Sequence, residues 1–214
     1  MKTKYILVAG LLALASSVGV NAQGFDIDMT KAQPVYSAEN GQGYDIVAAP
    51  KAKSNAPFFY SVKVADGNYK VTVVLGSKKK AGKTVVRAEN RRLMLDEVST
   101  RKGEFKTYSF IVNKRSPYIT DKMNVKIKPR EKETFTWDEK LTLEFTGAAP
   151  AVKSIKVEPA PAETTTVFLC GNSTVVDQFT EPYASWGQMV TRWFGPEVAI
   201  SNHAESGLTA GSFL

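Results

Sequence analysis

Residues 58–75 read FFYSVKVADGNYKVTVVL, and this stretch decides the fold of the first part of the chain. Two runs rich in β-branched and aromatic residues, 58–64 and 69–75, flank the tight-turn signal Asp66-Gly67. Apolar and polar residues alternate in the second run, as they do in a strand that buries one face. The pattern predicts two strands joined as a β-hairpin.

Further strand patterns follow at even spacing along the chain. They lie at residues 84–88, 106–112, 123–127, 141–145 and 152–157, with Gly, Asn, Ser and Pro between them. Many short strands separated by turn signals are typical of a β-sandwich, so we expect an all-β sandwich over residues 24–158. Aromatics such as Tyr36, Tyr44 or Trp137 could stack on sugar rings, although aromatic side chains more commonly serve core or edge packing.

Residues 1–22 are predicted to be a secretory signal peptide. Lys2 and Lys4 precede an uncharged apolar run, and small residues lead to a cleavage site near Ala22-Gln23. The apolar run is too short to favour a membrane span, so we expect no membrane partner. The sequence therefore predicts a secreted or periplasmic protein.

Cysteine and histidine are both rare in this chain. Cys170 is the one cysteine, which excludes an internal disulfide; it could be a reactive thiol, but we expect it to fill a buried strand end. With a single histidine as well, a zinc site is not expected. The sequence has no dinucleotide or phosphate-loop motif, so we expect no metal and no cofactor. Nothing in the sequence indicates the oligomeric state.

Positive charge is concentrated in the first part of the chain. The formal net charge is +7, and residues 51–133 hold 21 Lys or Arg against 8 Asp or Glu. From residue 167 onward, Arg192 is the one basic residue against four acidic ones. A cationic module of this kind could bind an acidic polysaccharide, or its lysines could protect exposed strand edges. No base-reading motif is present, so we expect no nucleic-acid partner.

The pattern changes after residues 159–164, which form a Pro-rich linker. Residues 166–169 predict a strand, residues 185–194 a short amphipathic helix, and residues 198–200 a second strand. Ser185 can cap the helix, and Gly195-Pro196 can end it. The aromatic and apolar residues of the helix fall on one face, which we expect to be buried. This order predicts a βαβ unit over residues 165–214.

Ser173 and Gly207 follow the two strands of this unit. A right-handed crossover places the ends of parallel strands at one edge of the sheet, so we expect the two residues to approach each other. A serine hydroxyl beside preorganised backbone N–H donors is the arrangement that acyl transfer uses. We therefore predict Ser173 and Gly207 as catalytic residues.

Two short runs in this part resemble a known family. Residues 171–175 are similar to the first block of the SGNH, or GDSL-type, hydrolases, and residues 202–207 to their second block. With Ser185-Trp186-Gly187 between them, the runs resemble rhamnogalacturonan acetylesterases. Upstream runs at 36–44 and 89–95 are similar to the sandwich that often precedes the catalytic domain in bacterial members.

The resemblance implies a secreted carbohydrate esterase that removes acetyl groups from an acidic pectic polysaccharide, rhamnogalacturonan. It implies that Ser173 is the nucleophile and that the amides of Ser173 and Gly207 bind the oxyanion. The fold expected is an all-β sandwich followed by the start of a flavodoxin-like, three-layer α/β hydrolase domain over residues 165–214.

The chain departs from the family in two places. Asn172 stands where the family usually has Asp, and no Asp-x-x-His block occurs before Leu214. His203 belongs to the second block and is expected to be packed or hydrogen-bonded rather than to act as the base. A serine without a base is a weak nucleophile, so this chain alone is expected to be an inactive N-terminal fragment. The alternative is a non-catalytic β-sandwich that binds glycan or serves only as structure.

Overall fold

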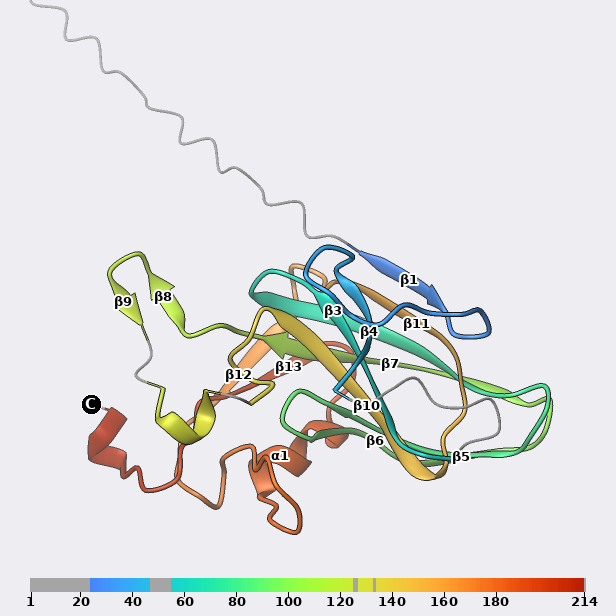
Figure 1. The fold of residues 1–214 in the computed structure, drawn as a ribbon. Coiled ribbons are helices and arrows are strands. Elements are labelled where there is room, and N and C mark those ends of the chain that lie inside the picture. The colour runs from blue at the N-terminus through green and yellow to red at the C-terminus, as the bar shows by residue number, and fades with distance from the viewer. Residues whose placement is uncertain (1–23, 47–54, 125–126, 133, 214) are drawn as a thin grey trace, which may run out of the picture.

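The computed structural model describes residues 24–46, 55–124, 127–132 and 134–213, and its centre is two packed antiparallel sheets (Figure 1). One sheet has four strands in the order β1 (Phe25–Asp28), β11 (Val152–Pro159), β4 (Gly67–Gly76) and β7 (Phe105–Lys114). The other has five strands in the order β2 (Gln42–Asp45), β3 (Phe58–Lys63), β10 (Lys140–Ala149), β5 (Gly82–Ala88) and β6 (Arg92–Thr100). The predicted all-β sandwich is confirmed. The predicted signal peptide lies outside the described residues.

The predicted hairpin at residues 58–75 is wrong, although both of its strands form. Strand β3 pairs with β2 and β10 in the five-stranded sheet, whereas β4 pairs with β11 and β7 in the four-stranded sheet. The turn at Asp66-Gly67 therefore carries the chain from one sheet to the other. Asp66 accepts hydrogen bonds from Lys114 and Ser116, which ties the turn to the end of β7.

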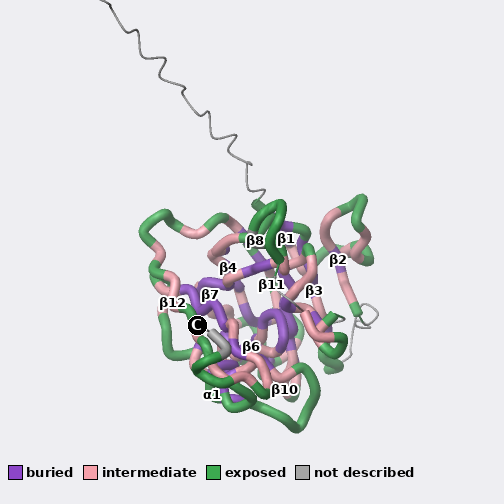
Figure 2. Tube along the Cα trace, turned by 90° about the vertical axis from the view of Figure 1, so that its left-hand side faces the viewer, coloured by how far each residue is buried: buried purple, intermediate pink, exposed green. Residues whose placement is uncertain are grey.

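A hydrophobic core lies between the two sheets and receives side chains from both. In Figure 2 the buried stretches of the chain run through the middle of the molecule. Val71, Val73 and Leu75 of β4 are fully buried because alternate residues of a strand point to the same side. Across from them, Phe58 of β3 stacks on Phe145 of β10, with ring centroids 5.1 Å apart. The same two residues are cross-strand neighbours, so the pair also stabilises the register.

Residues 165–213 form a smaller unit that packs on the sandwich. Strands β12 (Thr165–Leu169) and β13 (Val198–Asn202) pair in parallel, as expected, with α1 (Trp186–Met189) and a 3-10 helix (Val190–Trp193) between them. Strand β13 lies against β7, while both helices lie against β6. Among the described residues α1 is the one α-helix, and it has a single turn. These residues thus extend a β protein and give no evidence of a three-layer α/β domain. The division of the chain into two domains with a linker stays a prediction.

The helical segment presents the opposite face from the one expected. Ser185 caps it as predicted, its hydroxyl accepting from the Gln188 amide at 3.3 Å. Gly187, Gln188 and Thr191 are the buried residues, whereas Trp186 and Trp193 are 53% and 74% exposed. The reason is close approach to neighbouring backbone: a Cβ on Gly187 would lie 2.1 Å from the Val175 carbonyl oxygen.

Two further features complete the described residues. A small hairpin, β8 (Tyr118–Thr120) and β9 (Met123–Asn124), projects from one end of the sandwich (Figure 1). Two more 3-10 helices lie at Pro129–Glu131 and Ala210–Phe213. No helix in the described part of the chain has the length and apolar content that crossing a membrane requires.

Candidate functional site

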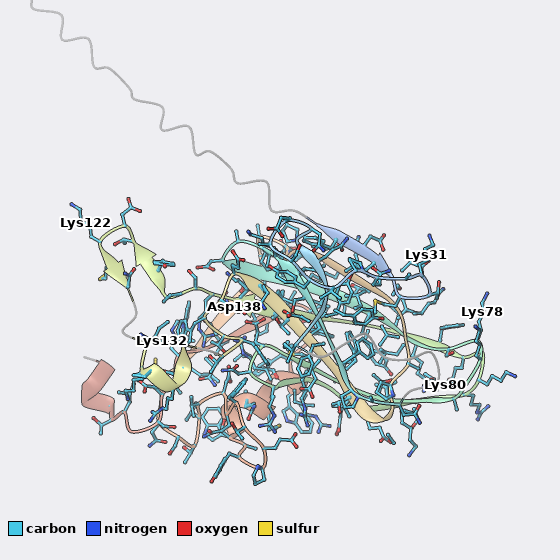
Figure 3. All side chains as sticks on the ribbon, in the orientation of Figure 1. Lys31, Lys78, Lys80, Lys122, Lys132 and Asp138 are labelled. Atoms are coloured by element: carbon cyan, nitrogen blue, oxygen red, sulfur yellow. The ribbon has the colours of Figure 1, made fainter. Side chains whose placement is uncertain are left out.

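A cleft of about 810 Å³ lies at one end of the sandwich. Three connections meet there: the segment after β1, the turn between β4 and β5, and the turn between β10 and β11. The residues that line it are 28–33, 76–80 and 150–154, together with Tyr44, Ala56, Phe58 and Phe105. Figure 3 shows Lys31, Lys78 and Lys80 at this end of the molecule, whereas Lys122 and Lys132 lie at the other end. The cleft has the size of a ligand pocket and an open, solvent-facing form.

The cleft is strongly positive. Its lining holds five lysines, namely Lys31, Lys78, Lys79, Lys80 and Lys153, and one acidic residue, Asp28, which together carry a net charge of +4. Hydrogen bonds from the Thr30 hydroxyl and amide hold the pKa of Asp28 below its ordinary value, so this carboxyl is ionised at neutral pH. Clustered charge of one sign in a cleft focuses the field and attracts ligands of the opposite sign.

Two of the lysines are positioned by neighbouring side chains at this end of the sandwich. Lys80 donates to the Asn55 side-chain oxygen at 2.8 Å, and Lys153 lies over the Phe105 ring at 5.0 Å from its centroid. Lys31 pairs with Asp28 at 3.6 Å, on a surface where such pairs contribute little. The run Lys78-Lys79-Lys80 is visible in the sequence, but no local signal shows that Lys31 and Lys153 join it.

The predicted catalytic residues lie elsewhere, on loops after β12 and β13. These loops are joined by backbone bonds from His203 N to Leu169 O (2.8 Å) and from Glu205 N to Gly171 O (3.1 Å). Ser173 and Gly207 are both exposed. In the part of the chain that the structure describes, the Ser173 hydroxyl has no hydrogen-bond partner; its carbonyl accepts from Gln178 at 3.1 Å. The catalytic roles of Ser173 and Gly207 therefore stay a prediction.

A shallow hollow of about 340 Å³ lies at the same edge. Its lining consists of Cys170, Gly171, Asn172, Leu208, Thr209 and Ala210, and includes neither Ser173 nor Gly207. Cys170 is exposed, so the expectation that it fills a buried strand end is wrong. The described residues contain no group of three or more His, Cys, Asp or Glu placed to hold a metal ion.

His203 is half-buried and hydrogen-bonded, as expected of it. Its Nε2 lies 2.9 Å from the Ser201 hydroxyl, and its ring contacts those of Trp137 and Phe168. Burial, together with the charges of Arg115 and Arg92, lowers the pKa of His203 to about 4. The imidazole is therefore neutral at pH 7.

A buried charged cluster connects residues 165–213 to the sandwich. Arg92 Nε lies 2.7 Å from Asp177 Oδ2, and the two side chains are 2% and 4% exposed. Asn202 donates to the other carboxylate oxygen of Asp177 at 2.7 Å, and the Asn202 carbonyl accepts from Arg115. Glu89 lies nearby, 2% exposed, and accepts from the Thr142 amide at 2.9 Å. No short-range pattern in the sequence predicts this cluster, because its members come from five places: the β5–β6 turn, β6, the segment after β7, the loop after β12, and β13.

Glu89 makes stability depend on pH. Burial raises its pKa from 4.5 to about 8, despite the opposing charges of Arg92 and Arg115. Since the folded pKa exceeds the unfolded one, the stabilisation is complete below pH 4.5 and lost as the pH rises through 8. Between pH 6.5 and 8 we expect the free energy of unfolding to fall by about 1 kcal/mol per pH unit, with the slope diminishing as the pH approaches the folded pKa. Glu89→Gln should remove this slope.

Urea unfolding at several pH values in that window checks the expectation. His203 does not interfere, because its stabilisation is fully present above its ordinary pKa of 6.5 and is lost only as the pH falls toward 4. The variant His203→Gln should thus keep the wild-type slope. An unchanged slope in Glu89→Gln would contradict the role given to Glu89.

Comparisons with known proteins give no family match and no curated relative. Among solved structures, protein YxiM from Bacillus subtilis is 20% identical, with 89% of this chain and 57% of that chain covered and a TM-score of 0.40. A family 35 carbohydrate binding module from Clostridium thermocellum is 11% identical (65% and 100% covered, TM-score 0.31). A family two carbohydrate esterase from Cellvibrio japonicus is 9% identical (87% and 53% covered, TM-score 0.26). The chain thus spans little more than half the length of YxiM.

The resemblance to SGNH hydrolases is wrong. Among the described residues, the regular structure is β-strand apart from the single-turn helix α1 and three short 3-10 helices, so the helical layers of such a hydrolase are absent from this part of the chain. The two blocks on which the resemblance rested are runs of five or six small and polar residues at strand ends. Runs this short do not define a fold by themselves.

Proposed function

We propose that this chain is a glycan-binding module that holds acidic polysaccharide in the lysine-lined cleft. The observation that carries the proposal is the net charge of +4 gathered in one cleft of about 810 Å³. Lysines that only protected strand edges would be spread along those edges, whereas five of them here converge on one hollow from three separate connections. Carboxylates along a polysaccharide are the complementary charges.

The cleft also suits a sugar polymer in its uncharged part. Tyr44 and Phe105 are half-buried rings in its lining, and Tyr44 lies edge to face against the buried Phe58, with ring centroids 5.7 Å apart. Aromatic rings offer flat apolar surface, and the lysine heads around them remain in water. We further propose that the module acts outside the cytoplasm, where residues 1–22 would direct it; the N-terminal sequence of the exported protein, expected to begin at Gln23, tests this.

A matched pair of double variants tests the binding function. Lys78→Gln/Lys79→Gln removes two charges from the cleft, and Lys122→Gln/Lys132→Gln removes two at the opposite end (Figure 3). At low ionic strength we expect the cleft variant of the full chain to bind polygalacturonate about tenfold more weakly. The control variant should bind within about twofold of wild type, because its two lysines lie at the other end of the molecule and the Coulomb energy falls with distance.

Isothermal titration calorimetry at low and at high salt measures both effects. Binding by the wild type should weaken as salt is added. Equal losses in the two variants would mean that net charge, rather than the cleft, governs binding. No binding by the wild type at low salt would refute the function outright.

A further inference from the structure

The backbone around the cleft places one lysine over one aromatic ring. In the pairing of β11 with β4, Val152 lies opposite Leu75 and Ser154 opposite Val74, so Lys153 is an extra residue in a β-bulge. Bulges redirect a side chain relative to the regular strand and are frequent beside functional sites. The Lys153 carbonyl accepts from the Met29 amide at 2.9 Å, which holds the bulge against the segment after β1.

The aromatic ring beneath Lys153 belongs to Phe105, and its position depends on Gly76. Phe105 is directly opposite Gly76 in the register of β7 and β4, and both residues line the cleft. A Cβ on Gly76 would lie 3.1 Å from Phe105 Cδ1 and 2.1 Å from the Glu104 carbonyl oxygen. The φ of Gly76, +127°, also disfavours any other residue. Glycine at this position therefore leaves room for the half-buried Phe105 ring in the cleft lining.

We propose that Phe105 and Lys153 form a subsite for a single uronic acid residue of the bound polysaccharide. This proposal rests on the glycan-binding function proposed above. The C–H face of the sugar ring packs on the Phe105 ring, and the Lys153 ammonium moves from the ring to the carboxylate of the same sugar.

Energetics favour this exchange. At an exposed site, the attraction of an ammonium to an aromatic face is weaker than a charge-assisted hydrogen bond to a carboxylate. The ring face that Lys153 leaves is then covered by the apolar face of the sugar. The lysines of the β4–β5 turn attract any polyanion. The Phe105 ring, in contrast, favours a polyanion built of sugar rings, because a sugar ring has an apolar face that can pack on it. The subsite thus makes the cleft select acidic polysaccharide over other acidic polymers.

The test compares two polymers with carboxylates, of which only one is made of sugars. For the full chain, we expect Phe105→Leu to weaken polygalacturonate binding about tenfold and to change poly-glutamate binding by less than about twofold. Phe105→Tyr keeps the ring and should bind both polymers as the wild type does. Phe168→Leu, the same change at a ring on β12 that is 65% exposed and outside the cleft, is the control and should affect neither.

The outcomes separate the two proposals. If Phe105→Leu weakens the binding of both polymers equally, or of neither, the subsite is refuted while the binding function stands. If wild type binds no polygalacturonate, both proposals fail. Should Phe105→Leu not fold, as judged by circular dichroism, saturation-transfer NMR on the wild type with trigalacturonate replaces it. Saturation concentrated on the C–H protons of one sugar face supports the subsite, and uniform saturation overturns it.

Discussion

Replacing Asp177 with alanine is expected to lower the free energy of unfolding by about 3–5 kcal/mol. The reason is the charge left behind: Arg92 is 2% exposed, and its Nε loses the carboxylate that lies 2.7 Å away. Its remaining hydrogen bond, from Nη1 to the Asn113 carbonyl at 2.9 Å, does not neutralise a buried guanidinium. The Asn202 amide loses its bond to the same carboxylate.

Glu181→Ala is the matched control for this variant. Glu181 also bridges residues 165–213 to the sandwich, through Arg87 at 3.0 Å and Arg91 at 3.2 Å, but its side chain is 65% exposed. An exposed pair is screened by solvent, so the control should lose about 1 kcal/mol or less. Urea unfolding followed by tryptophan fluorescence measures both variants. Similar small losses in the two would show that the buried pair does not hold the C-terminal unit in place.

Phe145→Ala is expected to have an effect of the same size, about 3–5 kcal/mol, for a different reason. Phe145 is fully buried between the sheets and stacks on Phe58 at 5.1 Å. Removing its ring leaves a cavity in a core that can collapse only partly, because β10 is a central strand held by β3 on one side and β5 on the other.

The same substitution at Phe168 is the control that shows how much of the lost unfolding free energy comes from the burial of Phe145. Phe168 lies on β12 and is 65% exposed, so Phe168→Ala should cost less than about 1 kcal/mol. Thermal unfolding of the two variants side by side provides the measurement. A small loss in Phe145→Ala would argue against the two-sheet core described above.

The candidate sites were predictable to different degrees. The cationic character of residues 51–133 is plain in the sequence, and the polyanion partner that it suggests stays a prediction. Lys153, however, reaches the cleft only through a bulge in β11, and Lys31 only through the segment that follows β1. Ser173 and Gly207 were predicted as a pair because each follows one of two strands expected to be parallel. The parallel strands formed, but no described side chain activates Ser173.

The helical segment shows why pattern alone misled. Its spacing of tryptophan, methionine and phenylalanine predicts a buried aromatic face. In the folded chain, Gln188 donates at 2.8 Å to the carbonyls of both Asn90 and Gln178, and Thr191 donates at 2.5 Å to the Leu93 carbonyl. These bonds satisfy backbone groups that would otherwise be buried without partners, and so they turn the small, polar face inward.

By itself, the sequence determined that the chain is built of short strands, that they form a β-sandwich, and that the sandwich is cationic. Alternation and turn residues are local properties, so they can be read without knowing what packs against them. Only the tertiary structure decided which strands pair. Residues 58–75 form two strands, as their alternation predicts, but the turn between them sends each to a different sheet. Strand partners depend on long-range burial and on contacts such as Asp66 with Lys114, which no window of neighbouring residues contains.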